Sequence, residues 1–388
     1  KKSGFYKKPK KPFVFLKKKK TMAQCDETFS FICDWYDSQA EIVRKYRLTY
    51  FVKRGGTNEV ELFDLKNKRV FLKRIGFPSL SLNDLFIGAT LVIYSRQLKI
   101  VDFADTYTKG KLGVLKTARI LFPNFEIDAS FGKMIQDIES TKGLTLRKIR
   151  FLRLQSSDSR ALAKELGWTG HLAQSLGKTD SLALEYTHPE GASIWKEVSK
   201  RLSDNFNVTG HVVSLSRESS SILLGPDECT ERKSSSSTAV LSNCTTCVVK
   251  PHALKEKNLG AILSEIVESG DWKITALKTL RLDISSAEKY LEVYRGVVRN
   301  FTEYARELSS AECVALEIVS TDPSLNSEDV VKEFRKVAGP FQWDFAKQLR
   351  SSSLRAKFGT SDVQNAIHCT DLAEDGESDS NYLFNVLF

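Results

Sequence analysis

The feature that most constrains the fold is an internal repeat. Eight positions recur at a constant offset of 128 residues with identical or similar side chains. The first set is Gly132, Ile135, Ile138, Leu146, Ile149, Leu152, Arg153 and Leu154, and the second is Gly260, Leu263, Ile266, Ile274, Leu277, Leu280, Arg281 and Leu282. In each set an amphipathic helix runs into a strand. The repeat therefore predicts two copies of one α/β unit, with helices covering a sheet.

The rest of the chain divides around these copies. A chain of 388 residues suggests two or three domains. Short strands separated by turns, such as Gly55-Gly56, predict a small, mostly antiparallel β domain at 28–111. We assign 1–27 as a basic extension, 112–228 as the first copy, 229–242 as a serine-rich linker and 243–388 as the second copy.

The net charge of +10 is confined to one end of the chain. Ten lysines lie within the first 20 residues, and the remainder carries 48 basic and 48 acidic residues. The extension is either a solvated segment, sequence upstream of a start codon at Met22, or a segment drawn to an acidic partner. The rest of the chain carries no basic excess, so we do not expect a nucleic-acid partner. No run approaches the ~18 apolar residues that would span a bilayer, and we expect no membrane partner.

Seven cysteines at irregular spacing do not predict a disulfide framework. Cys244 and Cys247 form a CxxC pair that opens an apolar run, and no second pair stands at zinc-ligand spacing. We interpret the pair as strand packing and predict no protein-held metal site.

Candidate phosphate-binding residues gather in the second copy. Lys250 and Pro251 end an apolar strand, Arg335 and Arg355 follow, and His368 lies near the C-terminal end. Individually, a Lys-Pro pair is a common strand end and a single histidine is usually a core residue. Together they suggest phosphate chemistry, because arginine and lysine bind phosphate oxygens and a neutral imidazole is a nucleophile.

These residues stand in motifs that resemble the nucleoside diphosphate kinase family: Val248-Val249-Lys250-Pro251, Leu354-Arg355-Ala356-Lys357-Phe358 and Asn365-x-x-His368-x-Thr370-Asp371. The resemblance implies a ferredoxin-like α+β sandwich in both copies. It implies that His368 is phosphorylated by ATP with Mg²⁺, and that Phe301 stacks on the base. Phosphate or sugar would contact Lys250, Arg335, Arg355 and Asn365. Thr370 replaces a family serine, and Asp379 replaces a glutamate that orients the histidine ring.

The second copy also departs from the family pattern. Leu291 stands where a tyrosine is expected near the histidine, although Tyr290 is adjacent. Phe341 stands where a threonine meets phosphate, and Asp379 is one methylene shorter than glutamate. We therefore expect weak or absent turnover. The sequence after His368 does not include the C-terminal tail through which such kinases form hexamers, so we do not expect a hexamer.

The first copy is degenerate at the motif positions. Phe122 stands at the lysine position before Pro123, and Ser199 stands at the position of Arg335. His211 follows Asn207 by four residues rather than three, and no acid follows it at the family spacing. We expect this copy to be structural, with His211 a polar side chain at the end of an element.

The N-terminal domain carries motifs similar to the DM ten domain of ciliary proteins: residues 31–37 (FICDWYD), 71–74 (FLKR), 84–88 (DLFIG) and 94–98 (YSRQL). One DM ten domain followed by two kinase-like copies resembles the nucleoside diphosphate kinase homologue seven family. This implies a pleckstrin-homology-like fold. It also implies a place inside axonemal doublet microtubules, with tubulin and other microtubule inner proteins as partners, or at centrosomes beside γ-tubulin complexes.

Two hypotheses remain at this point. In the first, the chain is a structural microtubule inner protein whose domains brace the tubulin lattice. In the second, the second copy transfers the γ-phosphate of ATP to nucleoside diphosphates through phospho-His368. The two are compatible.

Overall fold

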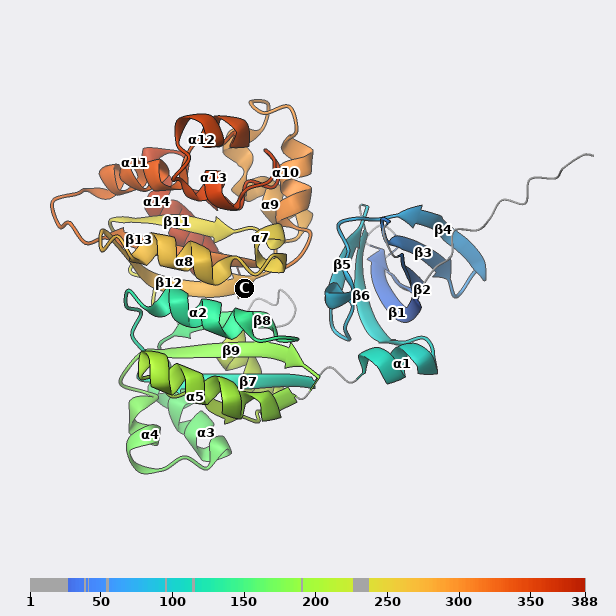
Figure 1. Cartoon of the computed structure of the whole chain (residues 1–388), viewed down its shortest axis with the longest axis horizontal. Coiled ribbons are helices and arrows are strands. Elements are labelled where there is room, and N and C mark those ends of the chain that lie inside the picture. The colour runs from blue at the N-terminus through green and yellow to red at the C-terminus, as the bar shows by residue number, and fades with distance from the viewer. Residues whose placement is uncertain are drawn as a thin grey trace, which may run out of the picture.

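The computed structural model describes residues 27–37, 40, 42–53, 56–94, 96–113, 116–189, 191–225 and 237–387. The basic extension up to residue 26, Gly55 and the linker residues 229–236 lie outside the described residues. Figure 1 shows a β-rich N-terminal domain beside a larger body formed by the two copies. Within the described residues, no helix has the length and apolar character needed to cross a bilayer.

The N-terminal domain is a six-stranded antiparallel sheet with one helix. Its strands occur in the order β4-β3-β2-β1-β6-β5. They are β1 (Glu27–Asp37), β2 (Ile42–Val52), β3 (Glu59–Asp64), β4 (Arg69–Gly76), β5 (Thr90–Ile93) and β6 (Arg96–Phe103), followed by α1 (Thr106–Leu112). Alternate residues of β1, Phe29, Phe31 and Cys33, are buried, as expected for a strand with one covered face. The domain therefore has a hydrophobic core of its own.

The two copies together form one eight-stranded antiparallel sheet of described strands, ordered β10-β7-β9-β8-β12-β13-β11-β14. The first copy contains β7 (Lys116–Pro123), α2 (Phe131–Ser140), β8 (Thr145–Leu152), α3 (Ser156–Leu166), α4 (Gly170–Ser175), β9 (Ser181–His188), α5 (Trp195–Phe206), β10 (His211–Val213) and α6 (Arg217–Leu224). In each half the strands occur in the ferredoxin-like order, with the fourth beside the first and the third between the first and second. The predicted α+β sandwich is confirmed.

The second copy repeats this plan with added helices. It contains β11 (Cys244–Val249), α7 (Pro251–Lys255), α8 (Leu259–Val267), β12 (Trp272–Leu280), α9 (Ile284–Tyr290), α10 (Phe301–Leu308), β13 (Cys313–Ser320), α11 (Ser327–Ala338), α12 (Trp343–Leu349), α13 (Leu354–Phe358), β14 (Ile367–Cys369) and α14 (Gly376–Asn381). The CxxC residues lie in β11, where both are buried free thiols. Cys244 and Cys247 are three residues apart on a strand and therefore point to opposite faces, so strand packing is the correct interpretation of the pair.

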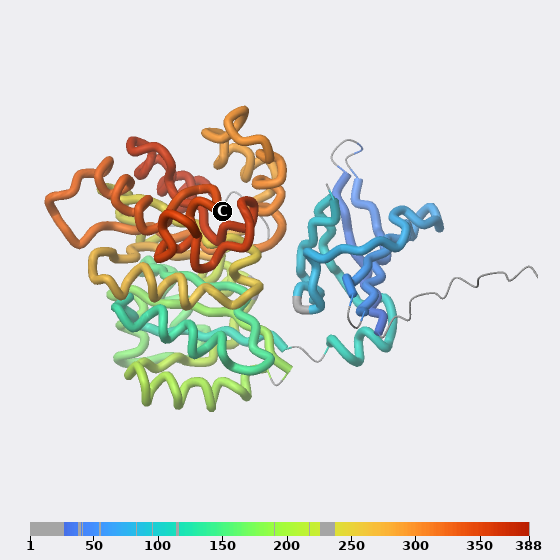
Figure 2. The backbone as a smooth tube through the Cα atoms, turned by 45° about the horizontal axis from the view of Figure 1, so that its top comes forward, coloured from blue at the N-terminus to red at the C-terminus, as the bar shows by residue number. Residues whose placement is uncertain are grey.

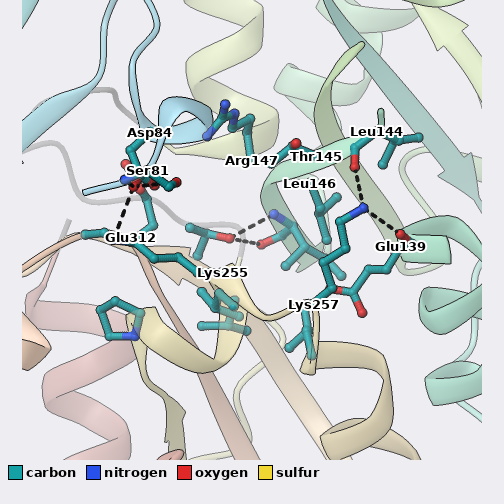
Figure 3. Close-up of a pocket in the computed structure, with 17 residues that line it drawn as sticks. Ser81, Asp84, Glu139, Leu144, Thr145, Leu146, Arg147, Lys255, Lys257 and Glu312 are labelled. Carbon is teal, nitrogen blue, oxygen red and sulfur yellow. Dashed lines mark hydrogen bonds and ion pairs between the residues drawn. The ribbon is translucent and has the colours of Figure 1, made fainter. Parts of the chain in front are cut away.

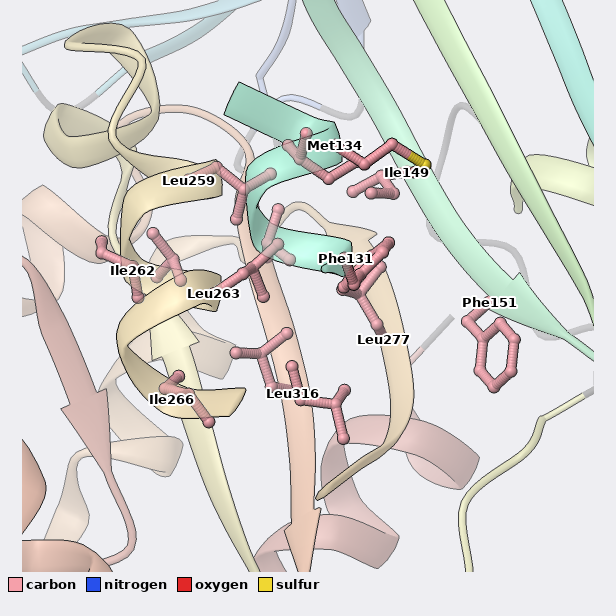
Figure 4. Packing of buried hydrophobic residues seen from close by; sticks show 14 of the residues in the cluster. Phe131, Met134, Ile149, Phe151, Leu259, Ile262, Leu263, Ile266, Leu277 and Leu316 are labelled. Atoms are coloured by element: carbon pink, nitrogen blue, oxygen red, sulfur yellow. The ribbon is translucent and has the colours of Figure 1, made fainter. Parts of the chain in front are cut away.

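The copies meet about a pseudo-two-fold axis. Strands β8 and β12 pair at the centre of the sheet, where Leu277 lies opposite Phe151 and Lys278 opposite Arg150. Above this seam α2 packs against α8 (Figures 1 and 2). Figure 4 shows Met134 and Phe131 of α2 close to Leu259 and Leu263 of α8. One hydrophobic core runs through both copies.

Two repeat glycines make the close approach of α2 and α8 possible. A Cβ added to Gly132 would lie 2.2 Å from the backbone nitrogen of Ser264, and one added to Gly260 would lie 2.4 Å from that of Gln136. Ser264 and Gln136 are themselves related by the repeat offset of 128 residues. Each glycine therefore makes room for the backbone of the opposite helix at equivalent places.

The copies differ most before their last strands. In the first copy, residues 207–210 alone join α5 to β10. In the second copy, residues 339–366 join α11 to β14 and include α12 and α13. Because Arg355 lies in α13, the first copy lacks the whole segment that carries this arginine.

The N-terminal domain contacts the junction of the two copies. The Lys255 Nζ donates to the Ser79 carbonyl at 2.7 Å and lies 3.3 Å from an Asp84 carboxylate oxygen. The Arg147 guanidinium lies over the Phe86 ring, 3.8 Å from its centroid. These contacts border a pocket of about 100 Å³ lined by all three domains (Figure 3).

Candidate active site

His368 lies at the edge of the eight-stranded sheet. It is the middle residue of β14, which pairs with β11 so that His368 lies opposite Val248. The side chain is only 2% exposed. Its Nε2 lies 3.7 Å from an Asp371 carboxylate oxygen. The ring is therefore enclosed by protein, with an acid beside it.

Lys250 and Asn365 form a buried pair at the end of β11. The Lys250 Nζ donates to Asn365 Oδ1 at 2.6 Å and to the Val363 carbonyl at 3.0 Å. The Asn365 Nδ2 donates to the Phe341 carbonyl at 2.8 Å. Lys250 and Asn365, both predicted to contact phosphate or sugar, therefore lie together, and their side-chain polar atoms bond to each other and to backbone carbonyls.

The two arginines occupy different environments. Arg355 is 3% exposed, and its Nη1 donates to the Gly339 carbonyl at 2.7 Å. Its Nη2 lies 3.6 Å from the Cys369 sulfur, beside His368. Arg335 is largely exposed, and its Nη1 donates to the Asp371 carbonyl. Thus Arg355 forms part of the buried site, whereas Arg335 covers its outer side.

Thr370 and Asp379 lie on the other side of His368. The Thr370 hydroxyl lies 2.9 Å from the Thr246 hydroxyl and is fully buried. Thr370 also provides a side-chain hydrogen bond to Asp379. Within the described residues no hydrogen bond joins Asp379 to the His368 ring. The predicted ring-orienting contact is therefore not made, and the shorter acid bonds to Thr370 instead.

An aromatic cluster surrounds Phe341, which stands at the position of the family threonine that meets phosphate. The Phe341 ring packs against Tyr294, with centroids 4.5 Å apart, and against Tyr304 at 5.0 Å. The Arg355 guanidinium lies 5.5 Å from the centroid of Phe341. At the outer rim, the guanidinium of Arg295 lies 4.7 Å from the centroid of Phe301. One face of the proposed base-stacking ring is therefore already covered.

Two tyrosines contact the histidine. The Tyr290 ring meets His368 edge-on at 4.9 Å, so it supplies an aromatic neighbour despite Leu291 at the family position. Tyr294 lies 5.9 Å from the His368 ring and donates its hydroxyl proton to Asp371. Our sequence reasoning missed Tyr294. Its position four residues after Tyr290 was the available signal, although α9 ends at Tyr290.

A second histidine, His252, bonds to the backbone just before the strand that carries His368. His252 Nε2 accepts a hydrogen bond from the Ala366 N–H at 3.1 Å, so Nδ1 carries the proton donated to Glu307 at 2.9 Å. Ala366 adopts a φ of +68°, which is unfavourable for a residue with a side chain. This bond and the Lys250 N–H bond to the Ala366 carbonyl hold the strained residue just before β14. The sequence alone did not reveal this support.

The electrostatics favour a neutral histidine. Burial lowers the pKa of His368 to about 4, Asp371 opposes this shift, and Arg355 adds to it. Burial likewise lowers the pKa of Lys250 to about 7, against the opposing charge of Glu307. A neutral imidazole is the protonation state that a phosphate-accepting nucleophile needs. The site has the correct residue types for phosphoryl transfer, but in a closed arrangement.

The residues present fit a nucleotide better than a protein-bound metal. Within the described residues no three His, Cys, Asp or Glu side chains are grouped to hold a metal ion. The resemblance to nucleoside diphosphate kinases implies Mg²⁺ bound together with the nucleotide phosphates. Lys250, Arg355 and Asn365 could bind these phosphates only after releasing their present partners. The bound ion would neutralise charge on the transferred phosphate.

Comparisons with known proteins agree with this domain order. The family model described as "Nucleoside diphosphate kinase 7 N-terminal PH domain" matches residues 23–114, and the model described as "Nucleoside diphosphate kinase" matches residues 243–387. The chain is 33% identical over 386 residues to nucleoside diphosphate kinase homolog 7 of Rattus norvegicus, covering 93% of this chain and 94% of that protein. The chain belongs to the nucleoside diphosphate kinase homolog 7 family. Its N-terminal domain has the pleckstrin-homology-like fold of that family, and its second copy has the nucleoside diphosphate kinase fold.

Other relatives match the same regions. The homolog 7 protein of Mus musculus is 32% identical over 382 residues, covering 93% of this chain and 94% of that protein. The nucleoside diphosphate kinase of Aquifex aeolicus is 32% identical over 143 residues, which is 37% of this chain and 94% of that protein. This chain thus aligns with the homolog 7 proteins along nearly its whole length, whereas the shorter Aquifex aeolicus kinase corresponds to a single domain of it.

In the first copy of this homolog 7 family member, the positions that correspond to the candidate active site carry residues that serve in packing. Phe122 is 1% exposed and packs edge-on against Trp195, with centroids 5.9 Å apart. Ser199 lies in α5. His211 begins β10 and packs against Trp168 at 5.3 Å. The position of the strand-end lysine is therefore part of the hydrophobic core of this copy.

Proposed function

We propose that the chain is a structural protein of ciliary and flagellar doublet microtubules, bound in their lumen beside tubulin and other inner proteins. One observation carries the preference for a structural role: the candidate active site is closed. His368, Lys250 and Arg355 are each at most 3% exposed, and their polar atoms face other protein groups. A protein whose turnover depended on this site would present these groups to its substrate.

The architecture supports the same proposal. The two copies share one sheet and one core, and the N-terminal domain contacts their junction through Lys255 and Arg147. Such a body holds three domains in fixed relative positions, which suits a brace. The ciliary location itself rests on the resemblance of the N-terminal motifs to the DM ten domain.

Extraction of axonemes tests this location. The full-length chain, tagged and expressed in ciliated cells, should remain with doublet microtubules after a high-salt wash that removes outer components. Release should require dissolution of the doublets themselves. Release together with the outer components would overturn the lumenal placement, and absence from axonemes with enrichment at centrosomes would favour the alternative site.

A second candidate function is phosphoryl transfer from ATP to nucleoside diphosphates, at the axoneme or the centrosome. The observation that favours it is that the fold brings Lys250, Arg355, Asn365 and neutral His368 together although they are far apart in the sequence. Turnover would require Phe341 to move and Mg²⁺ to enter with the nucleotide.

Labelling separates the two candidates. The full-length chain is the correct material, because the second copy shares its sheet with the first. It is incubated with γ-labelled ATP and Mg²⁺, and His368→Ala is the control. Acid-labile label in the wild type that disappears in the variant would establish the phosphohistidine. Equal label in both proteins, or none, would eliminate the enzymatic candidate.

A further inference from the structure

The two edges of the N-terminal sheet have different surroundings. The β5 edge and the segment before it face the kinase-like copies, where Lys255 contacts Ser79 and Asp84. The β4 edge lies on the far side of the domain (Figure 1). Among the described strands β4 pairs only with β3. One row of its backbone N–H and C=O groups therefore faces outward without a strand partner.

Strand β4 is also unusually exposed for a strand of eight residues. Val70 is 48% exposed, Phe71 38% and Ile75 42%, and Leu72 and Arg74 are the only partly buried residues of β4. The apolar side chains occur on both faces of the strand. A bound extended segment would cover them while completing the backbone hydrogen bonds.

The charge beside this edge is positive. Lys66 and Lys68, in the turn before β4, are exposed, and so is Arg69, the first residue of β4. None of the three forms an ion pair with another described residue. Lys73 adds a fourth exposed cation on β4 itself.

The acids beside the edge are fewer than these cations. Glu59 bonds to Lys53 and Arg74. Asp64 accepts hydrogen bonds from Asn67, whose amide is neutral, and Glu61 also lies on β3. These last two carboxylates stand against four exposed cations, Lys66, Lys68, Arg69 and Lys73, so the edge keeps a net positive charge.

We propose that the outward β4 edge binds an acidic, extended segment of a partner protein by strand addition. A second copy of this edge is a poor partner, because its lysines would repel these lysines. The chain's own N-terminal extension is a poor partner for the same reason, since it carries ten lysines. The inference concerns the N-terminal domain only, and it stands whether or not His368 transfers phosphate or the chain lies in the axoneme.

The test uses the full-length chain and a fluorescein-labelled peptide in which Glu and Val alternate. Binding is followed by fluorescence anisotropy at increasing salt concentrations. Two further peptides serve as probes: one with Lys in place of Glu, and one with Glu kept but alternate backbone nitrogens methylated. We expect binding of the first peptide, weakened by salt, and loss of binding for both others. Equal binding of the methylated peptide would overturn strand addition, because that peptide keeps its charge but cannot form the ladder.

A pair of charge variants locates the site. Lys66→Glu with Lys68→Glu reverses two charges beside β4, and we expect roughly tenfold weaker binding of the acidic peptide. Lys196→Glu with Lys200→Glu makes the same change of charge on exposed positions of α5 and should leave binding unchanged. An equal loss in both variants would overturn the assignment of the site to β4.

A third arm separates this proposal from a membrane role. Vesicles containing phosphatidylserine are sedimented with the wild-type chain and with the Lys66→Glu, Lys68→Glu variant. No binding, or equal binding by both proteins, is expected. Binding of vesicles but not of the acidic peptide by the wild type, lost in the variant, would overturn the proposal in favour of an anionic lipid surface.

Discussion

The contact between α2 and α8 can be tested by adding a single methyl group at Gly132. In Gly132→Ala, the new Cβ would lie 2.2 Å from the Ser264 nitrogen and 2.5 Å from its Cα. These are backbone atoms, so no side-chain rotation removes the clash. The helices would have to separate, or one of them would have to shift along its axis, and the shared core beneath them would lose contacts.

The magnitude follows from two opposing effects. Replacing glycine by alanine within a helix stabilises it by at most about 1 kcal/mol. Overpacking of a buried contact costs about 1 to 3 kcal/mol, and the clash with backbone places this site at the upper end. We therefore expect a net loss of about 2 kcal/mol in the free energy of unfolding. Gly260→Ala should give a similar loss, because its Cβ would lie 2.4 Å from the Gln136 nitrogen.

Urea unfolding of the full-length chain, followed by tryptophan fluorescence, measures this loss. Gly110→Ala is the matched control, because that glycine also lies in a helix but has no atom within 4 Å of an added Cβ. The control should be neutral or slightly stabilising. If Gly132→Ala and Gly260→Ala are as stable as the wild type, the helices do not touch as described and the argument fails.

Three further predictions concern the pocket and the site. Phe341→Thr should lower the free energy of unfolding by about 1 to 3 kcal/mol, because it removes the ring that packs on Tyr294. The same variant should increase ATP labelling of the full-length chain. Destabilisation without any gain in label would contradict the view that Phe341 blocks the site. Burial raises the pKa of the Glu139 carboxyl from 4.5 to about 7. The folded chain therefore holds the carboxyl proton more tightly than the unfolded chain does. The contribution of Glu139 to the free energy of unfolding falls as the pH rises from 4.5 to about 7. Urea midpoints should therefore show Glu139→Gln gaining more over the wild type at pH 8 than at pH 5, and an equal difference at both values would refute this. In thermal unfolding, Arg355→Ala should cost about 3 kcal/mol because it leaves buried acceptors unpaired, whereas exposed Arg335→Ala should cost less than about 1 kcal/mol; similar losses would contradict the difference in burial.

The repeat predicted much of the fold because its apolar spacing reports local structure. Ile135 and Ile138 indicated a helix and Ile149 and Leu152 a strand, and both lie in such elements, α2 and β8. The spacing carries no information on which strands are neighbours. The pairing of β8 with β12 depends on two edges meeting, so the continuous sheet could not be predicted from the sequence.

The site shows the same division. The motif residues Lys250, Asn365 and His368 could be assembled from the resemblance, and the structure places them together. Whether the cleft is open depends on the volume and orientation of side chains from separate segments. Phe341 was predicted only as a departure from threonine, and its packing on Tyr294 and Tyr304 became visible only in three dimensions.

The shared sheet also determines how the pair of copies would respond to mechanical load. Force along the strands stretches many hydrogen bonds at once, in shear, whereas force across the sheet opens them one pair at a time. Among the neighbouring pairs of described strands in this sheet, β8 and β12 have the fewest matched residue pairs, two. The contact between α2 and α8 lies over this pair of strands and adds a second connection between the two copies. The first copy, which has Phe122 at the lysine position, thus provides one of the two strands and one of the two helices at this seam.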